Sequence, residues 1–287
     1  MFSAAESLIR TMRSLSRDPM GFMGLCLVIM FLLTAVLAPF VSPFDPLKIN
    51  VQAKFMEPSF SHWLGTDQLG RDTLSRIIYG SRTALSISLS ATGLAGVCGL
   101  LLGLIAGFGP RWLDNVFVLL FDSISSLPMI MFALAVITVL GPGTVTLILV
   151  IILISIPGYA RLIRAQTLTL KSSDFVFAEK SMGASSARII LLHLLPNVVG
   201  PLVIILSMDI PVVIMLEAGL SYLNLGVRPP TPSWGNILYD GYTSIRSSPT
   251  LVIAAGVPLV LATLGFTFLG EGLRDGLDPK LQLRSLR

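Results

Sequence analysis

The sequence predicts an all-α polytopic membrane protein with six transmembrane helices and a helical segment held outside the bilayer. Hydrophobic residues make up 53% of the 287 positions and charged residues only 13%, whereas soluble domains carry roughly 25% charged residues. Long apolar runs alternate with the segments that hold most of the charge. Because only helices satisfy their backbone hydrogen bonds within a single segment in lipid, each run is expected to cross as a helix.

A transmembrane helix needs about 20 mainly apolar residues to cross a hydrocarbon core about 30 Å thick. The third candidate is the least regular, because it contains Asp114 and Asp122, and the fourth is short enough that it should extend at both ends. The predicted spans are 20–40, 84–108, 113–140, 145–159, 194–216 and 250–269.

The first run could also be a cleaved signal peptide, since arginines precede it and small residues occur near 35–38. Its apolar core is longer than the roughly 7–15 residues of a signal peptide, however, and Pro39 stands at the position where cleavage would occur. We therefore expect a retained membrane anchor.

Lysine and arginine are distributed unequally between the two sides of this topology. Thirteen of the 20 Lys and Arg residues fall on the side that holds both chain ends, and seven fall on the other. The excess predicts that both termini are cytoplasmic, and it accounts for the net charge of +4 without nucleic-acid binding. The expected organisation is a cytoplasmic segment at 1–19, a transmembrane domain at 20–270 and a cytoplasmic tail at 271–287, with external loops at about 41–82 and 217–249 and a cytoplasmic loop at about 161–193.

The most distinctive segment is the polar stretch 174–197 between the fourth and fifth runs. Ser173 and Asp174 can cap the start of a helix, Gly183 can end it, and Ser185 can cap a second helix. A loop that only joined two membrane helices could be far shorter. A helix–turn–helix outside the bilayer is therefore expected to bind another protein.

The first external loop contains a compact glycine-and-charge motif at 64–72. Gly65 and Gly70 allow tight turns, and charge-assisted hydrogen bonds among Asp67, Arg71 and Asp72 can hold the loop together. His62 is the only histidine on the external side, and a lone histidine beside a tryptophan is more often structural, so a structural role is favoured over a catalytic one.

Small and acidic residues occur within the apolar runs. Gly99, Gly103 and Gly107 share one face of the second run and allow another helix to approach closely. Asp122 and Asp209 are candidate pathway residues, because an ionisable residue inside a span is a functional hypothesis by default. The alternative for each aspartate is a simple hydrogen bond near a span end or beside water.

The last external loop is stiffened by Pro229, Pro230 and Pro232, and Tyr222 and Trp234 suit a membrane interface. Its length also allows contact with a soluble partner outside the membrane. No phosphate-binding Gly-x-x-x-x-Gly-Lys-Ser/Thr motif occurs in the sequence, so no ATP binding by that device is expected. The cysteines lie inside apolar runs and the sequence has only 2 histidines, so no metal site is expected.

Together these motifs resemble the permease subunits of ABC importers, specifically the C-type permeases of the dipeptide/oligopeptide/nickel family. Three separated motifs match in order, and the similarity covers roughly 19–280. They are Leu-Gly-Thr-Asp-Gln-Leu-Gly-Arg-Asp at 64–72, the cytoplasmic loop with Gly183 and Leu-Pro-Asn at 195–197, and Pro-Pro-Thr-Pro-Ser-Trp-Gly at 229–235.

The resemblance implies a type I importer permease fold and an assembly of several subunits. The expected partners are a second homologous permease, two cytoplasmic ATPase subunits or domains and an extracytoplasmic substrate-binding protein, in a bacterial or archaeal cytoplasmic membrane. No cofactor is expected on this chain, since ATP and Mg²⁺ would be used by the ATPase subunits. Peptides are the first expectation for the cargo, with nickel, metal chelates, opines and glutathione as alternatives.

The resemblance also implies roles for particular residues. The ATPase-docking loop, which contains a coupling helix, would include Phe177, Ala178, Glu179, Gly183, Ala184 and Ser185. The external family motif would include Gly65, Thr66, Asp67, Gly70, Arg71 and Asp72. The loop that faces the binding protein would include Pro229, Pro230, Pro232 and Trp234. The family's docking loop usually reads Glu-Ala-Ala where this chain has Phe-Ala-Glu at 177–179, which leaves the ion pair to the ATPase open. Where many relatives have Arg three residues before the aspartate matching Asp122, this chain has Leu119.

Two rival functions from other classes remain. A membrane-embedded enzyme would need catalytic groups that converge at one depth, for which only Asp122 and Asp209 are candidates. A secondary carrier would transport alone and would show inverted repeats and broken helices, and no clear internal repeat is visible in the sequence.

Overall fold

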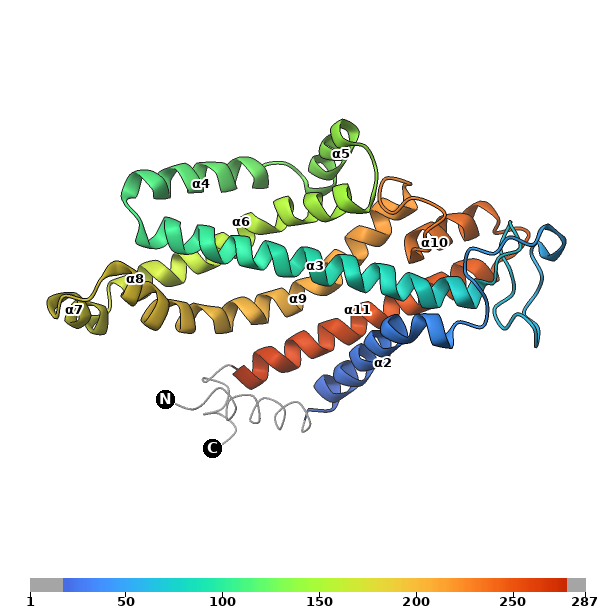
Figure 1. Ribbon diagram of the computed structural model, residues 1–287, viewed down its shortest axis with the longest axis horizontal. Coiled ribbons are helices and arrows are strands. Elements are labelled where there is room, and N and C mark those ends of the chain that lie inside the picture. Colours follow the sequence, from blue (N-terminus) through green and yellow to red (C-terminus); the bar gives the residue numbers. More distant parts are fainter. Residues whose placement is uncertain (1–17, 278–287) are drawn as a thin grey trace. The chain divides into compact units, whose positions relative to one another are not determined.

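The computed structural model describes residues 18–277, so the expected N-terminal segment and most of the expected tail lie outside the described residues. The described chain is helical, apart from a single β-bridge between Thr66 and Asp72. Its elements (Figure 1) are α2 (Pro19–Val41), the 3₁₀ turn η1 (Val51–Ala53), α3 (Thr73–Phe108), α4 (Arg111–Ser125), α5 (Met129–Leu140), α6 (Thr144–Lys171), α7 (Asp174–Ser181), α8 (Ser186–Arg188), the π-helical segment η2 (Ile189–Leu194), α9 (Leu195–Tyr222), α10 (Trp234–Thr243) and α11 (Thr250–Leu277).

Five helical stretches in the described residues are long and apolar enough to cross a membrane. They are Pro19–Val41, Thr73–Phe108, Thr144–Lys171, Ser186–Tyr222 and Thr250–Gly276. A sixth span is obtained if α4 and α5 together count as one. The prediction of an all-helical multi-span protein is confirmed.

The prediction of one continuous third helix over 113–140 is wrong, because α4 and α5 are bent by 91° at the break between them. Pro128 has no N–H to donate and disfavours helical geometry at Leu127 before it, so the helix ends there. The hydroxyls of Ser123 and Ser126 donate to carbonyl oxygens of the last turn of α4 at 2.7 and 2.8 Å. Such side-chain bonds often bend helices.

Two helices extend well beyond their apolar runs. Helix α3 begins at Thr73 rather than near residue 84, and α6 continues to Lys171, which agrees with the expectation that the fourth span extends beyond 145–159. Asp72 caps the start of α3, where its carboxylate accepts from the backbone N–H of Ser75 at 2.8 Å. The polar ends of these helices are thus continuous with the spans.

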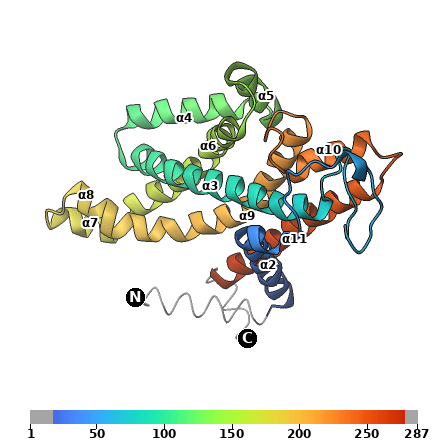
Figure 2. The same ribbon diagram turned by 45° about the vertical axis from the view of Figure 1, so that its right-hand side comes forward.

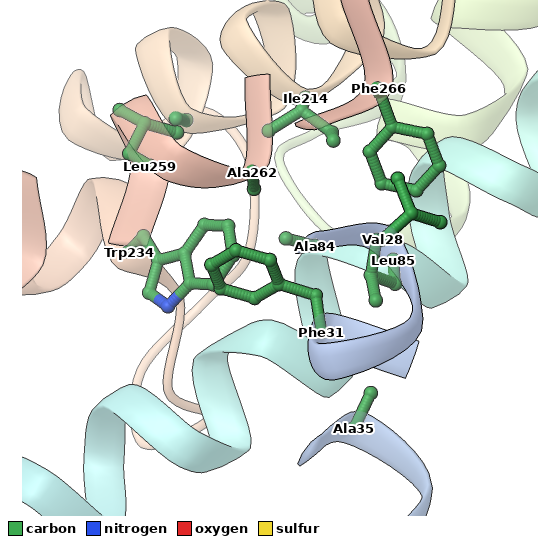
Figure 3. Close-up of a cluster of buried hydrophobic side chains, with 11 residues drawn as sticks. Val28, Phe31, Ala35, Ala84, Leu85, Ile214, Trp234, Leu259, Ala262 and Phe266 are labelled. Atoms are coloured by element: carbon green, nitrogen blue, oxygen red, sulfur yellow. The ribbon is translucent and has the colours of Figure 1, made fainter. Parts of the chain in front are cut away.

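The described residues form two compact units, the first of which comprises residues 18–90, 137–148 and 207–277. Its core gathers α2, α10, α11, the start of α3 and the end of α9 around Trp234, which is fully buried (Figure 3). The Phe31 ring meets the indole edge-on at 5.7 Å, and the indole N–H donates to the carbonyl of Ile77 at 3.1 Å. Helices α2 and α11 touch through Gly24, where a Cβ would lie 2.5 Å from the backbone N of Leu269.

The second unit comprises residues 91–136 and 149–206. In it α3 packs closely on α6, because a Cβ at Gly99, Gly103 or Gly107 would lie 2.6 to 2.7 Å from Tyr159, Ala160 or Thr167 atoms. The prediction that these glycines serve helix packing is confirmed. Helix α7 lies at one end of this unit and projects beyond the end of α3 (Figures 1 and 2).

Candidate functional site

The projecting segment is the short helix α7, which is followed by a glycine in the left-handed backbone conformation. Helix α7 ends at Ser181, and Gly183 has φ +81°. The backbone N–H of Gly183 donates to the carbonyl of Lys180 at 3.0 Å, and that of Ala184 donates to the carbonyl of Glu179 at 3.0 Å. This pair of hydrogen bonds is typical of a helix C-terminus that reverses at glycine. The prediction that Gly183 ends the helix is confirmed.

The segment that follows is not a separate short helix. Ser185 caps α8 as predicted, since its hydroxyl accepts from the N–H of Arg188 at 3.3 Å. Helical structure then continues through η2 and α9 without a break from Ser186 to Tyr222. Ser173 occupies the N-cap position of α7, but its hydroxyl donates to the carbonyl of Leu170 at 2.5 Å instead of capping. The turn therefore joins α7 directly to a long helix.

The α7 turn exposes large apolar side chains, and Val176 is the only buried residue of α7. Phe177 is 60% exposed and Met182 is 73% exposed, although both are side chains that proteins usually bury. Val176 inserts into the core of the second unit, and Ala184 packs against the same core. The turn is thus attached at two points while its outer face remains free to bind a partner.

Glu179 has a side-chain contact that sequence reasoning missed. One carboxylate oxygen lies 3.3 Å from Nε2 of His193, and both side chains are partly buried. The Phe175 ring lies 6.2 Å from the imidazole. Although 14 positions separate the two residues, the reversal at Gly183 brings them together. Glu179 therefore has a partner within its own chain.

The motif at 64–72 forms a buried ionic cluster in the first unit. Asp67 is fully buried, and its carboxylate accepts from Nε of Arg71 at 2.7 Å and from the guanidinium of Arg76. Asp240 of α10 lies 3.5 Å from Arg71 and 3.2 Å from Arg76. Buried charges are stable in proteins when they are paired in this way. The motif therefore fixes the start of α3 to α10.

Backbone conformation and local hydrogen bonds explain the composition of this loop. Gly70 has φ +71°, and a Cβ there would lie 1.8 Å from the carbonyl oxygen of Asn50, so only glycine fits. Gly65 has a similar φ of +70°. The Thr66 hydroxyl accepts from the N–H of Met56 at 2.9 Å, and Asp72 contacts Nδ1 of His62 at 2.8 Å. Each of these contacts is structural.

The loop after α9 is held by buried polar side chains. One oxygen of Glu217 accepts from the hydroxyls of Ser221 and Ser233, each at 2.8 Å. The side-chain amide of Asn236 donates to the carbonyl of Val227 at 2.8 Å. These bonds hold residues 217–236 in one conformation.

The predicted binding-protein-facing residues of this loop separate into two classes. Pro229 and Pro230 are exposed, whereas Pro232 and Trp234 are buried. The expectation that Trp234 lies at a membrane interface or faces a partner is wrong, because its ring fills the core and its N–H is bound to Ile77. The exposed part of the loop is restricted to its proline tip.

Asp122 lies in the last turn of α4 and contacts α6. Its Oδ1 accepts from Nη2 of Arg161 at 3.0 Å, and the same nitrogen donates to the Ser125 hydroxyl at 3.0 Å. The two side chains are 64% and 43% exposed. Asp209 is partly buried on α9 and belongs to the other unit. No sequence pattern indicated that Arg161 would supply the cation beside Asp122.

A second pair links the same two helices nearer to α7. Asp114 Oδ2 accepts from Nη2 of Arg164 at 2.7 Å, and the rest of that guanidinium also contacts the carboxylate. Lys171 donates to the last carbonyls of α3, at 2.9 Å for Phe108. Within residues 18–277, no group of three His, Cys, Asp or Glu side chains could hold a metal ion.

Comparison with known proteins gives the family. Residues 99–283 match the family of binding-protein-dependent transport system inner membrane components, and residues 7–58 match the N-terminal TM domain of oligopeptide transport permease C. A dipeptide transport system permease protein of Alkalihalophilus pseudofirmus is 34% identical, with 98% of this chain and 92% of the relative covered. A glutathione transport system permease protein of Pectobacterium atrosepticum is 36% identical, with 89% and 85% covered.

Among solved structures, the inward-facing MetNI methionine ABC transporter matches with a TM-score of 0.54 over 70% of this chain and 95% of that chain. At 18% identity this match concerns the fold alone. ATP hydrolysis in this family belongs to a separate ATPase, which agrees with the lack of a phosphate-binding motif here. The chain is a member of the binding-protein-dependent ABC importer permeases, of the C type found in peptide transport systems.

Proposed function

We propose that this chain imports peptides as one of two permeases in an ABC importer, and that its α7 turn is the docking point for an ATPase. The observation that carries the docking role is the exposed apolar face of α7 on a turn anchored by Val176. Relatives named for dipeptides, di/tripeptides and glutathione support a peptide cargo. The partners would be a second permease, two ATPases that use ATP and Mg²⁺, and an external binding protein.

The mechanism is mechanical and needs no catalytic residue in this chain. ATP-driven closure of the ATPase pair would displace α7, and the helix that begins at Ser186 would move with it, because helical structure is continuous from there to Tyr222. Rigid elements that take two arrangements carry such motions. The chain would need only different contacts in the two states.

The proposed orientation places both termini and the α7 turn in the cytoplasm, with the 64–72 motif and the proline tip outside. The excess of Lys and Arg on the terminal side supports it. The exposed Pro229 and Pro230, on a loop held by Glu217 and Asn236, would contact the binding protein. A loop that is already ordered loses little freedom when a partner docks.

Asp122 and Asp209 are proposed to lie along the translocation pathway. Asp122 carries an ionisable group, is 64% exposed and lies on the bent pair of helices that forms a candidate span, so contact with lipid would be costly. An aqueous path between the two permeases would hydrate it.

Reconstitution tests this function. The chain would be placed in proteoliposomes alone, with its second permease, and with the permease pair, ATPases and binding protein. Uptake of radiolabelled dialanine is expected only in the complete system and only with ATP. Uptake by the chain alone would identify a secondary carrier and contradict the proposal.

A further inference from the structure

An apolar groove lies in the first unit beside helices α2 and α11, which run side by side (Figures 1 and 2). Its volume is about 420 Å³. One face of α11, from Thr250 to Leu261, supplies the largest part of the lining. The other elements supply Met30 and Phe31 of α2, Pro58 and Leu64 of the loop that follows α2, and Ile77 of α3. Neither the α7 turn nor the proline tip lines this groove, so the roles proposed above leave it unassigned.

The chemistry of the lining suits a hydrocarbon. Among the described residues that line the groove, only Thr250 has a polar side chain, and its hydroxyl lies 2.9 Å from that of Ser248. A polar ligand would lose its hydrogen bonds to water here without gaining others. Ile253 and Val257 are 64% and 50% exposed, although proteins usually bury such side chains. An apolar ligand in the groove would cover them.

The groove belongs to the end of a candidate membrane span. Helices α2 and α11 are both long and apolar enough to cross a membrane, and the span of α11 begins at Thr250, where the lining also begins. Pro58 lines the groove and also a neighbouring hollow formed with Phe60 and Trp63, which are exposed. Exposed aromatic side chains beside the end of a span are typical of the membrane–water interface. An apolar ligand of this groove is therefore expected to come from the membrane, whichever leaflet this end meets.

The dimensions of the groove fit one hydrocarbon chain and not a helix. Thr250 and Leu261 are 11 positions apart, which corresponds to roughly 16 Å along α11, and half of a hydrocarbon core is about 15 Å thick. The volume divided by this length gives a mean cross-section of roughly 25 Å², whereas a helix with its side chains is about 10–12 Å in diameter. Where α2 and α11 meet directly, they do so at Gly24, as is usual for helices that pack in membranes. The groove is thus too narrow to receive a helix of a second permease.

We infer that this groove binds one acyl chain of a membrane phospholipid. The acyl chain would lie along α11 in contact with Ile253, Val257 and Met30, and the headgroup would lie near Phe60 and Trp63, at the start of the span. Each methylene that enters the groove should strengthen binding by about fourfold, so a bound lipid would outlast the lipids that only surround the protein. The inference goes beyond the proposed function and depends neither on the cargo nor on the side of the membrane that holds the termini.

Photo-crosslinking of retained lipid tests the inference. The permease pair with its ATPases would be placed in nanodiscs that contain phosphatidylglycerol with a diazirine in the middle of one acyl chain. The complex would then be extracted and washed with detergent to remove loosely held lipid before irradiation, and mass spectrometry would locate the label. We expect label on α11 between Ile253 and Leu261 and on Met30. Ala254→Phe places a ring in the groove and should reduce this label at least tenfold, because several methylenes would be displaced.

Val260→Phe is the matched control, since Val260 is exposed on the same helix but does not line the groove, and its label should be unchanged. Met30→Trp fills the groove from α2 and gives a second test that is independent of the fold of the Ala254→Phe variant. Equal labelling of all three variants would show general contact with lipid and overturn the inference. Absence of label from α11 in the unmodified complex would also overturn it, and label that appears only when the chain is prepared without its second permease would identify a subunit contact instead.

Discussion

Gly183 combines a left-handed backbone with open surroundings, so its requirement for glycine is conformational. Its φ is +81°, and a Cβ would meet no atom within 4 Å. For other L-residues this conformation costs roughly 1–2 kcal/mol, which corresponds to a factor of about 5–30 in the population of the turn. A substitution here therefore tests the turn without disturbing packing.

We predict that Gly183→Val uncouples ATP hydrolysis from uptake while the permease still inserts and assembles. Gly183→Asn is the matched control, because asparagine tolerates the left-handed region better than other residues, and it should retain most of the uptake. The ratio of dialanine transported to ATP hydrolysed measures the effect. Equal ratios for the valine variant and the unmodified protein would show that the turn is not needed.

Asp67 stabilises the first unit by pairing with two buried arginines. Removing one partner of a buried charge pair costs about 3–5 kcal/mol, because the remaining charge is left uncompensated. Asp67→Ala should therefore lower the thermal unfolding midpoint of the purified protein in detergent. Asp45→Ala is the control, since Asp45 is exposed and accepts only a local bond from the N–H of Leu47. A similar midpoint for both variants would contradict the ionic-cluster account.

Individual residues were predictable from sequence where local backbone chemistry decides their role. Gly183 and Gly70 were recognisable as turn residues because glycine alone takes a positive φ without penalty. Trp234 was misplaced, because an aromatic ring in a proline-rich loop gives no sign that it folds back under Phe31. The partners of Asp122 and Glu179 were also missed, since each lies on a segment brought near only by folding.

At the scale of elements, α7 presents an apolar face where a membrane-protein loop would normally be polar. Phe177 and Met182 are the most exposed of the large apolar side chains on α7 and its turn. A few buried aromatic and apolar anchors usually carry most of the energy of an interface. Docking of the ATPase should therefore depend on these two side chains more than on Glu179, which is paired internally.

We predict that Phe177→Ser weakens ATPase binding by about 2 kcal/mol, the usual scale of an interface hot spot, or roughly 30-fold in Kd. Pull-down of the ATPase by the tagged permease pair measures it. Phe60→Ser is the control, because Phe60 is also exposed but lies in the 41–82 loop, and ATPase recovery should be unchanged. Equal losses in both variants would indicate a general folding defect and contradict the docking role.

Element boundaries were predicted less well than element types. Hydropathy located each candidate span within residues 18–277. Helices α3 and α6 continue beyond their apolar runs because polar residues at their ends take part in caps and ion pairs. The break between α4 and α5 had a visible signal in Pro128. The prediction nevertheless treated residues 113–140 as one helix, because the sequence on both sides of Pro128 is apolar.

For the whole molecule, the proposed topology predicts which sites an impermeant reagent can reach. Cysteines introduced at Ser61 and Thr231 should react from outside intact cells, and one introduced at Ser172 should react only after the cells are opened. All three positions are exposed in the chain, so reactivity reports sidedness rather than burial. Labelling of Ser172→Cys in sealed cells would reverse the orientation. The family could be predicted from the sequence at this scale because three motifs occur in order. Peptides as the class of cargo followed from that resemblance, whereas the particular peptide could not be predicted.

The ionic cluster around Asp67 has a consequence for biosynthesis. Arg76 and Asp240 are 164 positions apart in the chain yet share a hydrogen bond, so the cluster is complete only when almost the whole chain has been made. Chains are synthesised from the N-terminus, and earlier segments can fold first. Until α10 emerges, Arg71 and Arg76 have only Asp67 as a carboxylate partner in this cluster. A nascent chain, or one truncated before α10, would therefore carry unbalanced positive charge at the start of α3.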